Sequence, residues 1–383
     1  MSLFVLLLGL TLPSSGAAQA VPSNRRAPVP ATDSVRAIAT PRTAFPSEAA
    51  SAGVTRFSFI DYGDNRGRFD GQLEQQLHLM VVTSMLRTIA ARANGPDPIR
   101  FVISGGDAVN DGRNAQQWNT SFIDVVERLT KQGDVPVFPA PGNHDATHTE
   151  DRDAPDRQQA LRHFYAAYRN FIPPETSPRR LAGYPTYAFG YGNTFVLAMD
   201  SNIAGDSTQY AWICGQLSNL DRQRYKHIVV ALHHPAFSSG PHGGATVEAP
   251  AAALRARYMP IFRQYHVDLI LAGHEHLFEH WVERYRDASG PHRIDEIVSG
   301  GGGAPHYAYR GEPDLKEYLR AGAADSVRLE HLVRPGMNAW ENPSHYLVIH
   351  VDGDHVRVEV IGVDDGADFQ PYRSRTADLD PSR

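Results

Sequence analysis

The chain has 383 residues, of which 42% are hydrophobic and 21% charged, and its net charge is −6. This length can bury a sizeable core as one large domain or two smaller ones. No run of basic residues is present, so a nucleic-acid-binding surface is not expected. Cys214 is the single cysteine, which excludes an intrachain disulfide.

Residues 1–20 are predicted to form a cleavable signal peptide. Phe4–Leu12 is apolar, and Ala18-Gln19-Ala20 is a small-x-small sequence of the kind that signal peptidase cuts. The apolar stretch is too short for a transmembrane anchor, although the basic residue that normally precedes it is missing. We therefore expect a secreted or periplasmic protein. Residues 21–53 are rich in Pro, Ala and Ser without periodicity, which predicts a disordered linker.

From residue 54 to residue 363, apolar β-branched runs alternate with stretches of helical length, and residues 364–383 are expected to be a tail. The predicted strands are Phe57–Tyr62, Ile99–Ser104, Val135–Pro139, Thr194–Asp200, Ile228–Leu232 and Val267–Ala272. The predicted helices are Gln72–Ala93, Gln116–Lys131, Asp156–Phe171, Tyr210–Tyr225 and Ala251–Tyr265. This alternation indicates an α/β domain with several crossover connections.

Two segments favour antiparallel pairing. Tyr187–Phe189 precedes a Gly-Tyr-Gly-Asn turn before residue 194, and His345–Val351 precedes an Asp-Gly-Asp turn before residue 355. The sheets are therefore expected to be mixed. Two polar segments that contain proline, Asp151–Arg180 and Tyr307–Pro343, are predicted to form a rim or lid over a site.

Polar residues follow five of the predicted strands, at the edge where open α/β sheets build sites. The five sequences are Gly63-Asp64, Gly105-Gly106-Asp107, Gly142-Asn143-His144-Asp145, His233-His234-Pro235 and Gly273-His274-Glu275-His276. Each alone is weak, because an Asp after a strand is more often a turn residue or a helix N-cap. Together they predict a metal centre. Oxygen and imidazole ligands without thiolate suit Zn, Mn or Fe.

In this order, the five sequences resemble the calcineurin-like metallophosphoesterase superfamily, and within it the purple acid phosphatase-like branch. The resemblance covers Arg56 to Val363. It implies a four-layer α/β/β/α sandwich of two mixed sheets. It also implies two divalent or trivalent metal ions, with Asp107 as the bridging ligand. The first ion would be completed by Asp64 and His276, and the second by Asn143, His233 and His274.

The resemblance also implies the chemistry of phosphate ester hydrolysis. A metal-bound hydroxide would attack phosphorus, and His144 would donate a proton to the leaving group, with Asp145 orienting its ring. Asn143 and His144 would contact the substrate. His233 is preferred over His234 because the ligand of the family stands two residues before the proline.

Four residues leave alternatives open. Most members of the family have a histidine where this chain has Arg66, which is predicted to bind a phosphate oxygen, with an exposed turn residue as the alternative. Purple acid phosphatases have a tyrosine where this chain has Asn110, so an iron(III) centre of that type is not expected. Asp61 competes with Asp64 as the first ligand or is a paired buried carboxylate. His242 is either a substrate-binding residue or an ordinary loop histidine.

The favoured hypothesis is therefore an exported phosphomonoesterase that acts on a small-molecule phosphate ester. A phosphodiesterase acting on nucleotides or glycerophosphodiesters is the alternative with the same chemistry. A relative without activity that binds a phosphorylated ligand or a protein is the alternative of another class. No nucleophile-elbow or P-loop sequence is present, and the oligomeric state is left open.

Overall fold

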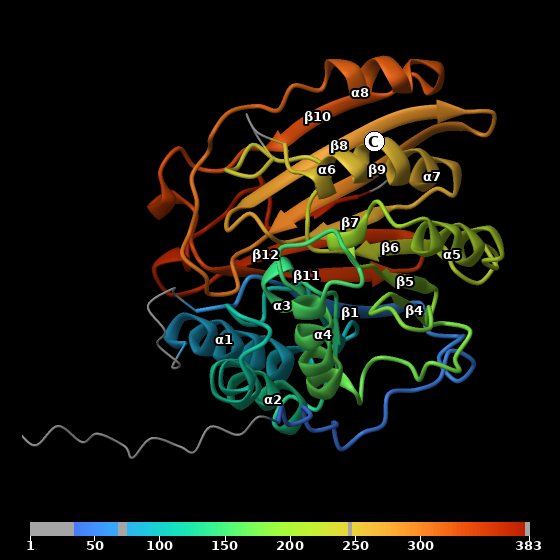
Figure 1. Ribbon diagram of the computed structural model, residues 1–383. Coiled ribbons are helices and arrows are strands. Elements are labelled where there is room, and N and C mark those ends of the chain that lie inside the picture. The colour runs from blue at the N-terminus through green and yellow to red at the C-terminus, as the bar shows by residue number, and fades with distance from the viewer. Residues whose placement is uncertain (1–33, 68–74, 244–246, 380–383) are drawn as a thin grey trace, which may run out of the picture. The chain divides into compact units, whose positions relative to one another are not determined.

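Two mixed β-sheets lie face to face in the computed structural model, which describes residues 34–67, 75–243 and 247–379 (Figure 1). These residues belong to one structural unit, Thr32–Arg383. The other unit, Met1–Ala31, lies outside the described residues, and so does the predicted signal peptide.

The first sheet has the spatial order β13-β12-β11-β1-β2-β3. Its strands are β1 (Arg56–Tyr62), β2 (Ile99–Ser104), β3 (Val137–Pro139), β11 (His345–Asp352), β12 (His355–Gly362) and β13 (Thr376–Asp378). Strands β1, β2 and β3 are parallel, whereas β11, β12 and β13 add antiparallel pairs at one side.

The second sheet has the spatial order β10-β8-β9-β7-β6-β5-β4. Its strands are β4 (Tyr187–Tyr191), β5 (Thr194–Ala198), β6 (His227–Ala231), β7 (Leu269–Ala272), β8 (Phe278–Asp287), β9 (Gly290–Ser299) and β10 (Arg328–Val333). Strands β5, β6, β7 and β9 run parallel, and the pairs β4–β5, β8–β9 and β8–β10 are antiparallel.

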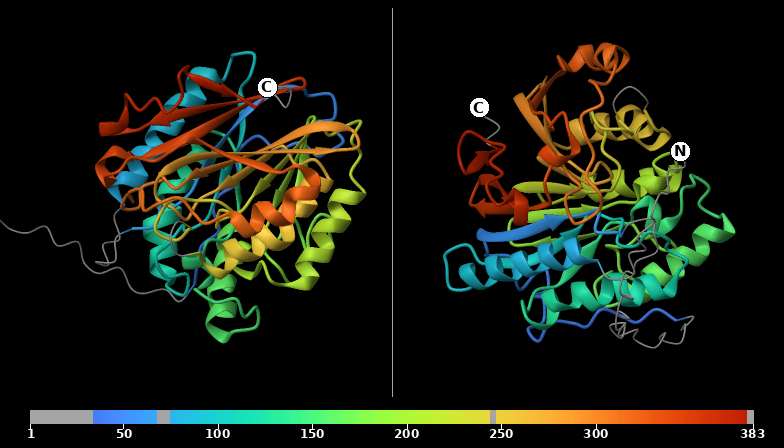
Figure 2. Two further views of the ribbon diagram at one scale, coloured as in Figure 1. Left: turned by 90° about the horizontal axis from the view of Figure 1, so that it is seen from above. Right: turned by 90° about the vertical axis from the view of Figure 1, so that its left-hand side faces the viewer.

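Helices cover the outer side of each sheet, which gives the expected four layers (Figures 1 and 2). On the first sheet lie α1 (Gln76–Arg92), α2 (Asp124–Lys131), which a π-helical turn Gln117–Ile123 precedes, and α4 (Pro155–Tyr168). On the second sheet lie α5 (Ser207–Ser218), α6 (Ala249–Ala253), α7 (Met259–Gln264) and α8 (Lys316–Ala321). The short helix α3 (Asn143–Ala146) follows β3 directly.

The strands at the centre of both sheets are near-continuous apolar runs because both of their faces are covered. Strand β6 is buried at every position, and β1 at every position after Arg56. A hydrophobic core that includes Phe59, Val102, Val229 and Leu271 joins the two sheets and the helices of the first. Among the described residues, no helix has the length and apolar character needed to cross a membrane.

The structure changes the predicted boundaries of the domain at both ends. Residues 34–53, expected to be a disordered linker, pack on the core, where Ile38 is fully buried and its amide donates to the carbonyl of Ala167. In the expected tail, β13 pairs with β12. Isolated apolar anchors such as Ile38 have no periodicity, so the sequence pattern does not reveal them.

Candidate active site

Five loops that follow parallel strands of both sheets meet at one place. The first sheet contributes Asp64 after β1, Asp107 after β2 and Asn143 after β3. The second sheet contributes His233 after β6 and His274 after β7. The site therefore lies where the carboxyl ends of strands from the two sheets come together.

Three of these side chains extend from left-handed backbone, which residues other than glycine rarely adopt. The φ angles are 59° at Asp64, 54° at Asp107 and 71° at His274. Gly106 has a φ of 95°, and a Cβ atom there would lie 2.6 Å from the amide nitrogen of Gly142. Such strain persists only where the surroundings enforce it, and it accumulates at functional sites.

The side chains expected at the second metal position converge with acceptor atoms. Asn143 Oδ1 lies 2.8 Å from His233 Nε2 and 3.0 Å from His274 Nδ1. The two imidazole nitrogens are 3.2 Å apart, and Asp107 Oδ1 is 3.3 Å from His233 Nε2. These side chains come from four different loops, so the contacts join segments that are far apart in the sequence.

The hydrogen bonds of the outer ring nitrogens indicate which nitrogen of each imidazole carries the proton. His233 Nδ1 lies 2.8 Å from the carbonyl oxygen of Gly105, and His274 Nε2 lies 3.0 Å from Glu248 Oε2. In the neutral form that metal binding requires, each ring donates outward and turns an unprotonated nitrogen to the centre of the site. Asn143 Nδ2 contacts His148, which directs the amide oxygen inward. Lone pairs that meet without a proton between them fit a metal cation.

The first metal position has acceptor atoms on Asp64, His276 and Asp107, and the side chain of Arg66 lies beside them. His276 Nδ1 lies 2.6 Å from the carbonyl oxygen of Pro305, so its Nε2 is the acceptor that lies 3.5 Å from Asp64 Oδ1. Asp64 Oδ1 is buried without a hydrogen-bond partner among the described residues. Arg66 Nε is 3.1 Å from Asp107 Oδ2, and Arg66 Nη2 is 3.4 Å from His276 Nε2. Arg66 is 4% exposed, so it is not the exposed turn residue considered above.

His144 lies beside Asp107, with its Nε2 3.9 Å from Asp107 Oδ2. Its Nδ1 is 2.8 Å from the carbonyl oxygen of Asn110, which therefore orients the ring. Asp145 was predicted to orient this ring, and the structure shows a further role for it. Both Asp145 oxygens accept from backbone amides, those of Ala108 and Gly142 among them, so Asp145 fixes the loops that carry Asp107 and Asn143.

Two further histidines and Asp61 lie near the cluster. The His242 ring lies 4.6 Å from that of His274, and its Nδ1 is 3.4 Å from Glu275 Oε2. His234 is buried and contacts Ser201 Oγ through Nδ1. Asp61 lies within β1, where burial and the nearby Asp64 raise its pKa well above the usual range. A group of metal-ligand type is formed by Asp64, Asp107 and His233, with ligand atoms within 4.8 Å of one another.

Three contacts of the site were not predicted from the sequence. The Tyr307 ring stacks on that of His276 with the centroids 4.0 Å apart, Glu248 contacts His274, and His148 contacts Asn143. Tyr307 is the first residue of a segment that was predicted to form a rim or lid. That prediction is the single sequence signal for any of these three contacts. The other two depend on contacts that no local pattern encodes.

Burial and charge act in opposite directions on Asp107. Burial disfavours its ionised form, but His233, His144 and Arg66 outweigh this effect and hold the pKa of Asp107 well below its usual range. Burial lowers the pKa of His144, although Asp107 partly opposes the shift. An ionised Asp107 therefore provides the negative charge that a bound cation requires.

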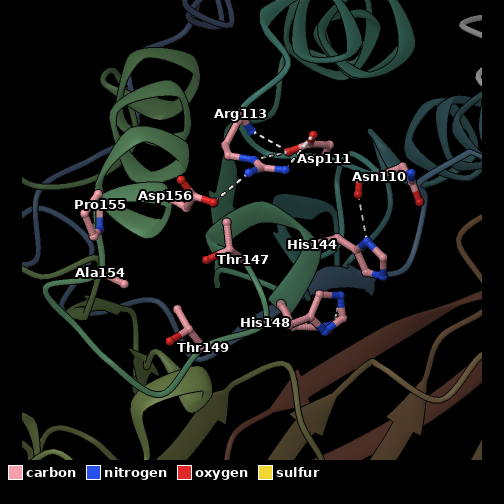
Figure 3. A pocket seen from close by; sticks show the side chains of 11 residues that line it. Asn110, Asp111, Arg113, His144, Thr147, His148, Thr149, Ala154, Pro155 and Asp156 are labelled. Carbon is pink, nitrogen blue, oxygen red and sulfur yellow. Dashed lines mark hydrogen bonds and ion pairs between the residues drawn. The ribbon is translucent and has the colours of Figure 1, made fainter.

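A cavity of about 630 Å³ opens beside His144 (Figure 3). His144 and His148 lie at one side of it, and Ala154, Pro155 and Asp156 lie across it. Part of the predicted rim segment, which begins at residue 151, thus lines the approach to the candidate proton donor. The cavity is lined by Asn110, Asp111, Arg113, Asn143, His144, Thr147, His148, Thr149, Ala154, Pro155 and Asp156.

The calcineurin-like phosphoesterase family model matches residues 71–278. The chain belongs to this family.

Known relatives of this calcineurin-like phosphoesterase include purple acid phosphatases. This chain is 26% identical to a purple acid phosphatase of Glycine max over 138 residues. The matched segment covers 36% of this chain and 28% of the relative. The chain is 29% identical over 159 residues to an uncharacterized protein of Mycobacterium tuberculosis, which covers 38% of this chain and 27% of the relative. The matches thus span little more than a quarter of these relatives.

Two solved structures share the fold of this calcineurin-like phosphoesterase. The purple acid phosphatase of yellow lupin seeds has a TM-score of 0.58 at 18% identity, over 85% of this chain and 55% of that one. GAP50 of Plasmodium, the anchor in the inner membrane complex, has a TM-score of 0.51 at 15% identity, over 86% and 90% of the two chains.

Proposed function

We propose that the chain is an exported metal-dependent phosphomonoesterase. One observation carries the proposal: unprotonated acceptor atoms of Asp107, Asn143, His233 and His274 converge beside His144 at the edge of a cavity. The chemistry of this donor set fits a divalent ion. When bound, such an ion supplies Lewis-acid activation of water and neutralises charge on the phosphate.

The chain's own residues perform the remaining tasks. The imidazole of His144 lines the cavity that would receive the phosphate ester, and the backbone amide of His144 holds Asp107 Oδ1 at 2.9 Å. When its imidazole carries both protons, His144 donates the one on Nε2 to the leaving oxygen, while its Nδ1–H stays bonded to the carbonyl of Asn110. Asp145 holds together the loops that carry Asp107 and Asn143, so the proton donor His144 keeps its position relative to the proposed metal ligands.

The cavity beside His144 offers space for the leaving group of a phosphate ester. It adjoins Asn143 and His144 and is lined by polar side chains, including Asp111, Arg113 and Asp156. The leaving group of a small phosphate monoester fits beside the proton donor. A diester needs room for a second substituent, and the same residues serve its hydrolysis, so phosphodiesterase activity is the second candidate.

GAP50 illustrates why the fold alone does not decide between hydrolase and binding protein. A protein that only binds has no use for a proton donor beside a set of metal ligands. The joint presence of His144 and the acceptor cluster therefore favours hydrolysis over binding of a phosphorylated or protein partner.

Metal content and turnover, measured together, test the proposal. The chain from Val21 onward is expressed, its metals are determined, and p-nitrophenyl phosphate and bis-p-nitrophenyl phosphate are assayed. We expect metal-dependent turnover, faster with the monoester, that falls at least 100-fold in His144→Ala and Asp107→Asn. His355→Ala and Asp365→Asn, at exposed positions away from the site, serve as matched controls and retain activity. A chain that binds metal but hydrolyses neither compound would contradict the proposal.

Export is tested separately. The full chain is expressed in a bacterium, the periplasm and medium are separated from the cytoplasm, and the N-terminus of the product is sequenced. We expect an exported product that begins at Val21. Retention of the intact N-terminus in the cytoplasm would refute this part of the proposal.

A further inference from the structure

The first and second metal positions differ in what faces their acceptor atoms. At the second position, the unprotonated nitrogens of His233 and His274 face the oxygen of Asn143, and the described contacts of that oxygen are to these two rings. At the first position, the acceptors on Asp107 and His276 face the guanidinium of Arg66. The second position thus brings together acceptor lone pairs alone. The first position already contains a cation, the guanidinium of Arg66.

We propose that the guanidinium of Arg66 takes the place of the first metal ion, so that the protein binds one metal ion per chain, at the second position. This inference rests on the proposed metal-dependent function and alters the expected number of ions.

The contacts of Arg66 match those that an ion would make. Arg66 Nε lies 3.1 Å from Asp107 Oδ2, the oxygen that is left for the first position once Oδ1 faces His233. Arg66 Nη2 lies 3.4 Å from His276 Nε2, the acceptor of that ring. Metal bonds to these two atoms are about 2.0–2.2 Å long. An ion bonded to both would therefore occupy the space into which the guanidinium N–H groups point.

Charge leads to the same conclusion. Arginine stays protonated in proteins, and Arg66 is 4% exposed, so its charge is poorly screened by water. A divalent ion next to it would meet strong repulsion at short range. The guanidinium also offsets part of the negative charge of Asp107, which weakens the attraction for a second ion.

The local backbone holds Arg66 in this position. Its amide donates to the carbonyl oxygen of Asp107 at 2.8 Å, so the two residues are joined by main chain as well as by side chain. The hydroxyl of Tyr307, whose ring stacks on His276, lies 3.5 Å from Arg66 Nη2. Withdrawal of the guanidinium would break these contacts inside a buried site.

Metal stoichiometry tests the inference directly. Wild type, Arg66→His and the control Arg87→His, which changes an exposed arginine of α1, are loaded with Zn or Mn and freed of excess ion by gel filtration. We expect one ion per chain in wild type and in Arg87→His, and two in Arg66→His. Two ions per chain in wild type would overturn the inference, and so would one ion in a folded Arg66→His.

Single-position variants keep the inference testable if Arg66→His does not fold. His276→Ala changes the first position alone and is expected to retain one ion, whereas His274→Ala is expected to retain none. Loss of an ion from His276→Ala would overturn the inference. Turnover measured on the same samples separates the two claims: one ion without turnover refutes the proposed function alone, and two ions with turnover refute this inference alone.

Discussion

Asn143 Nδ2 lies 2.9 Å from His148 Nδ1, and this contact turns Asn143 Oδ1 toward His233 and His274. An amide has one oxygen and one nitrogen, so whichever neighbour accepts from the nitrogen decides where the oxygen points. His148 is therefore a positioning residue for a proposed metal ligand.

Removal of this contact is expected to weaken metal binding. His148→Ala should reduce metal affinity about 10–100-fold, because the amide is free to rotate its oxygen away. Competition with a chromogenic chelator measures the affinity. His148→Gln, which restores an acceptor, should recover part of it, and His355→Ala is the control. Unchanged affinity in His148→Ala would show that the amide is held by other contacts.

Gly106 is expected to tolerate no side chain. In Gly106→Ala, the new Cβ would lie 2.6 Å from the Gly142 nitrogen and 2.8 Å from His233 Nδ1, at a φ of 95°. Backbone strain alone contributes about 1–3 kcal/mol of destabilisation, and the clash adds to it. The melting temperature and metal content should both fall. Gly205→Ala is the control, because a Cβ there meets nothing within 4 Å, and an equal loss in both variants would contradict the argument.

The pH dependence of stability should carry a contribution from Glu359. Burial opposes its ionisation, but contacts with His350, Arg375 and Arg92 outweigh burial and lower the pKa of Glu359 to about 2 from 4.5. Because the folded pKa lies below the unfolded one, the stabilisation is present above pH 4.5 and is lost as the pH falls toward 2. The difference in melting temperature between wild type and Glu359→Gln should therefore shrink over this window. A difference independent of pH would refute the assignment.

Arg157 and Asp200 form an ion pair in which both side chains are fully buried. Arg157→Met should destabilise the protein by about 3–5 kcal/mol, because it leaves the Asp200 charge buried without a counterion. Urea unfolding measures the loss, and Arg162→Met, at an exposed position of α4, is the control. The double variant Arg157→Met, Asp200→Leu should lose less than the single one. A larger loss in the double variant would mean that the pair itself is strongly stabilising.

The strands that position the site were predictable because they are buried on both faces. Runs such as that of β1 have few polar residues, and the observed strand extends the predicted one by Arg56 alone. The β8–β9 hairpin was not predicted, because its buried side chains include Glu283 and Asp295. These carboxylates are paired with Arg263 and Arg293, and a sequence pattern counts them as exposed.

The same contrast holds at the site. The proposed ligands could be found because strand ends deliver them in a recognisable order, and the structure brings Asp107, Asn143, His233 and His274 together. The carbonyl that orients His144 and the partners of Arg66 could not be found. Those contacts depend on the exact path of loops that share no local sequence pattern.

The two sheets divide the donor set between them. Asp107 and Asn143 follow strands of the first sheet, and His233 and His274 follow strands of the second. An ion bound by all four is therefore a crosslink between the two halves of the sandwich. Its binding energy opposes their separation, and a small parting of the sheets would release the ion while each sheet still kept its own hydrogen bonds.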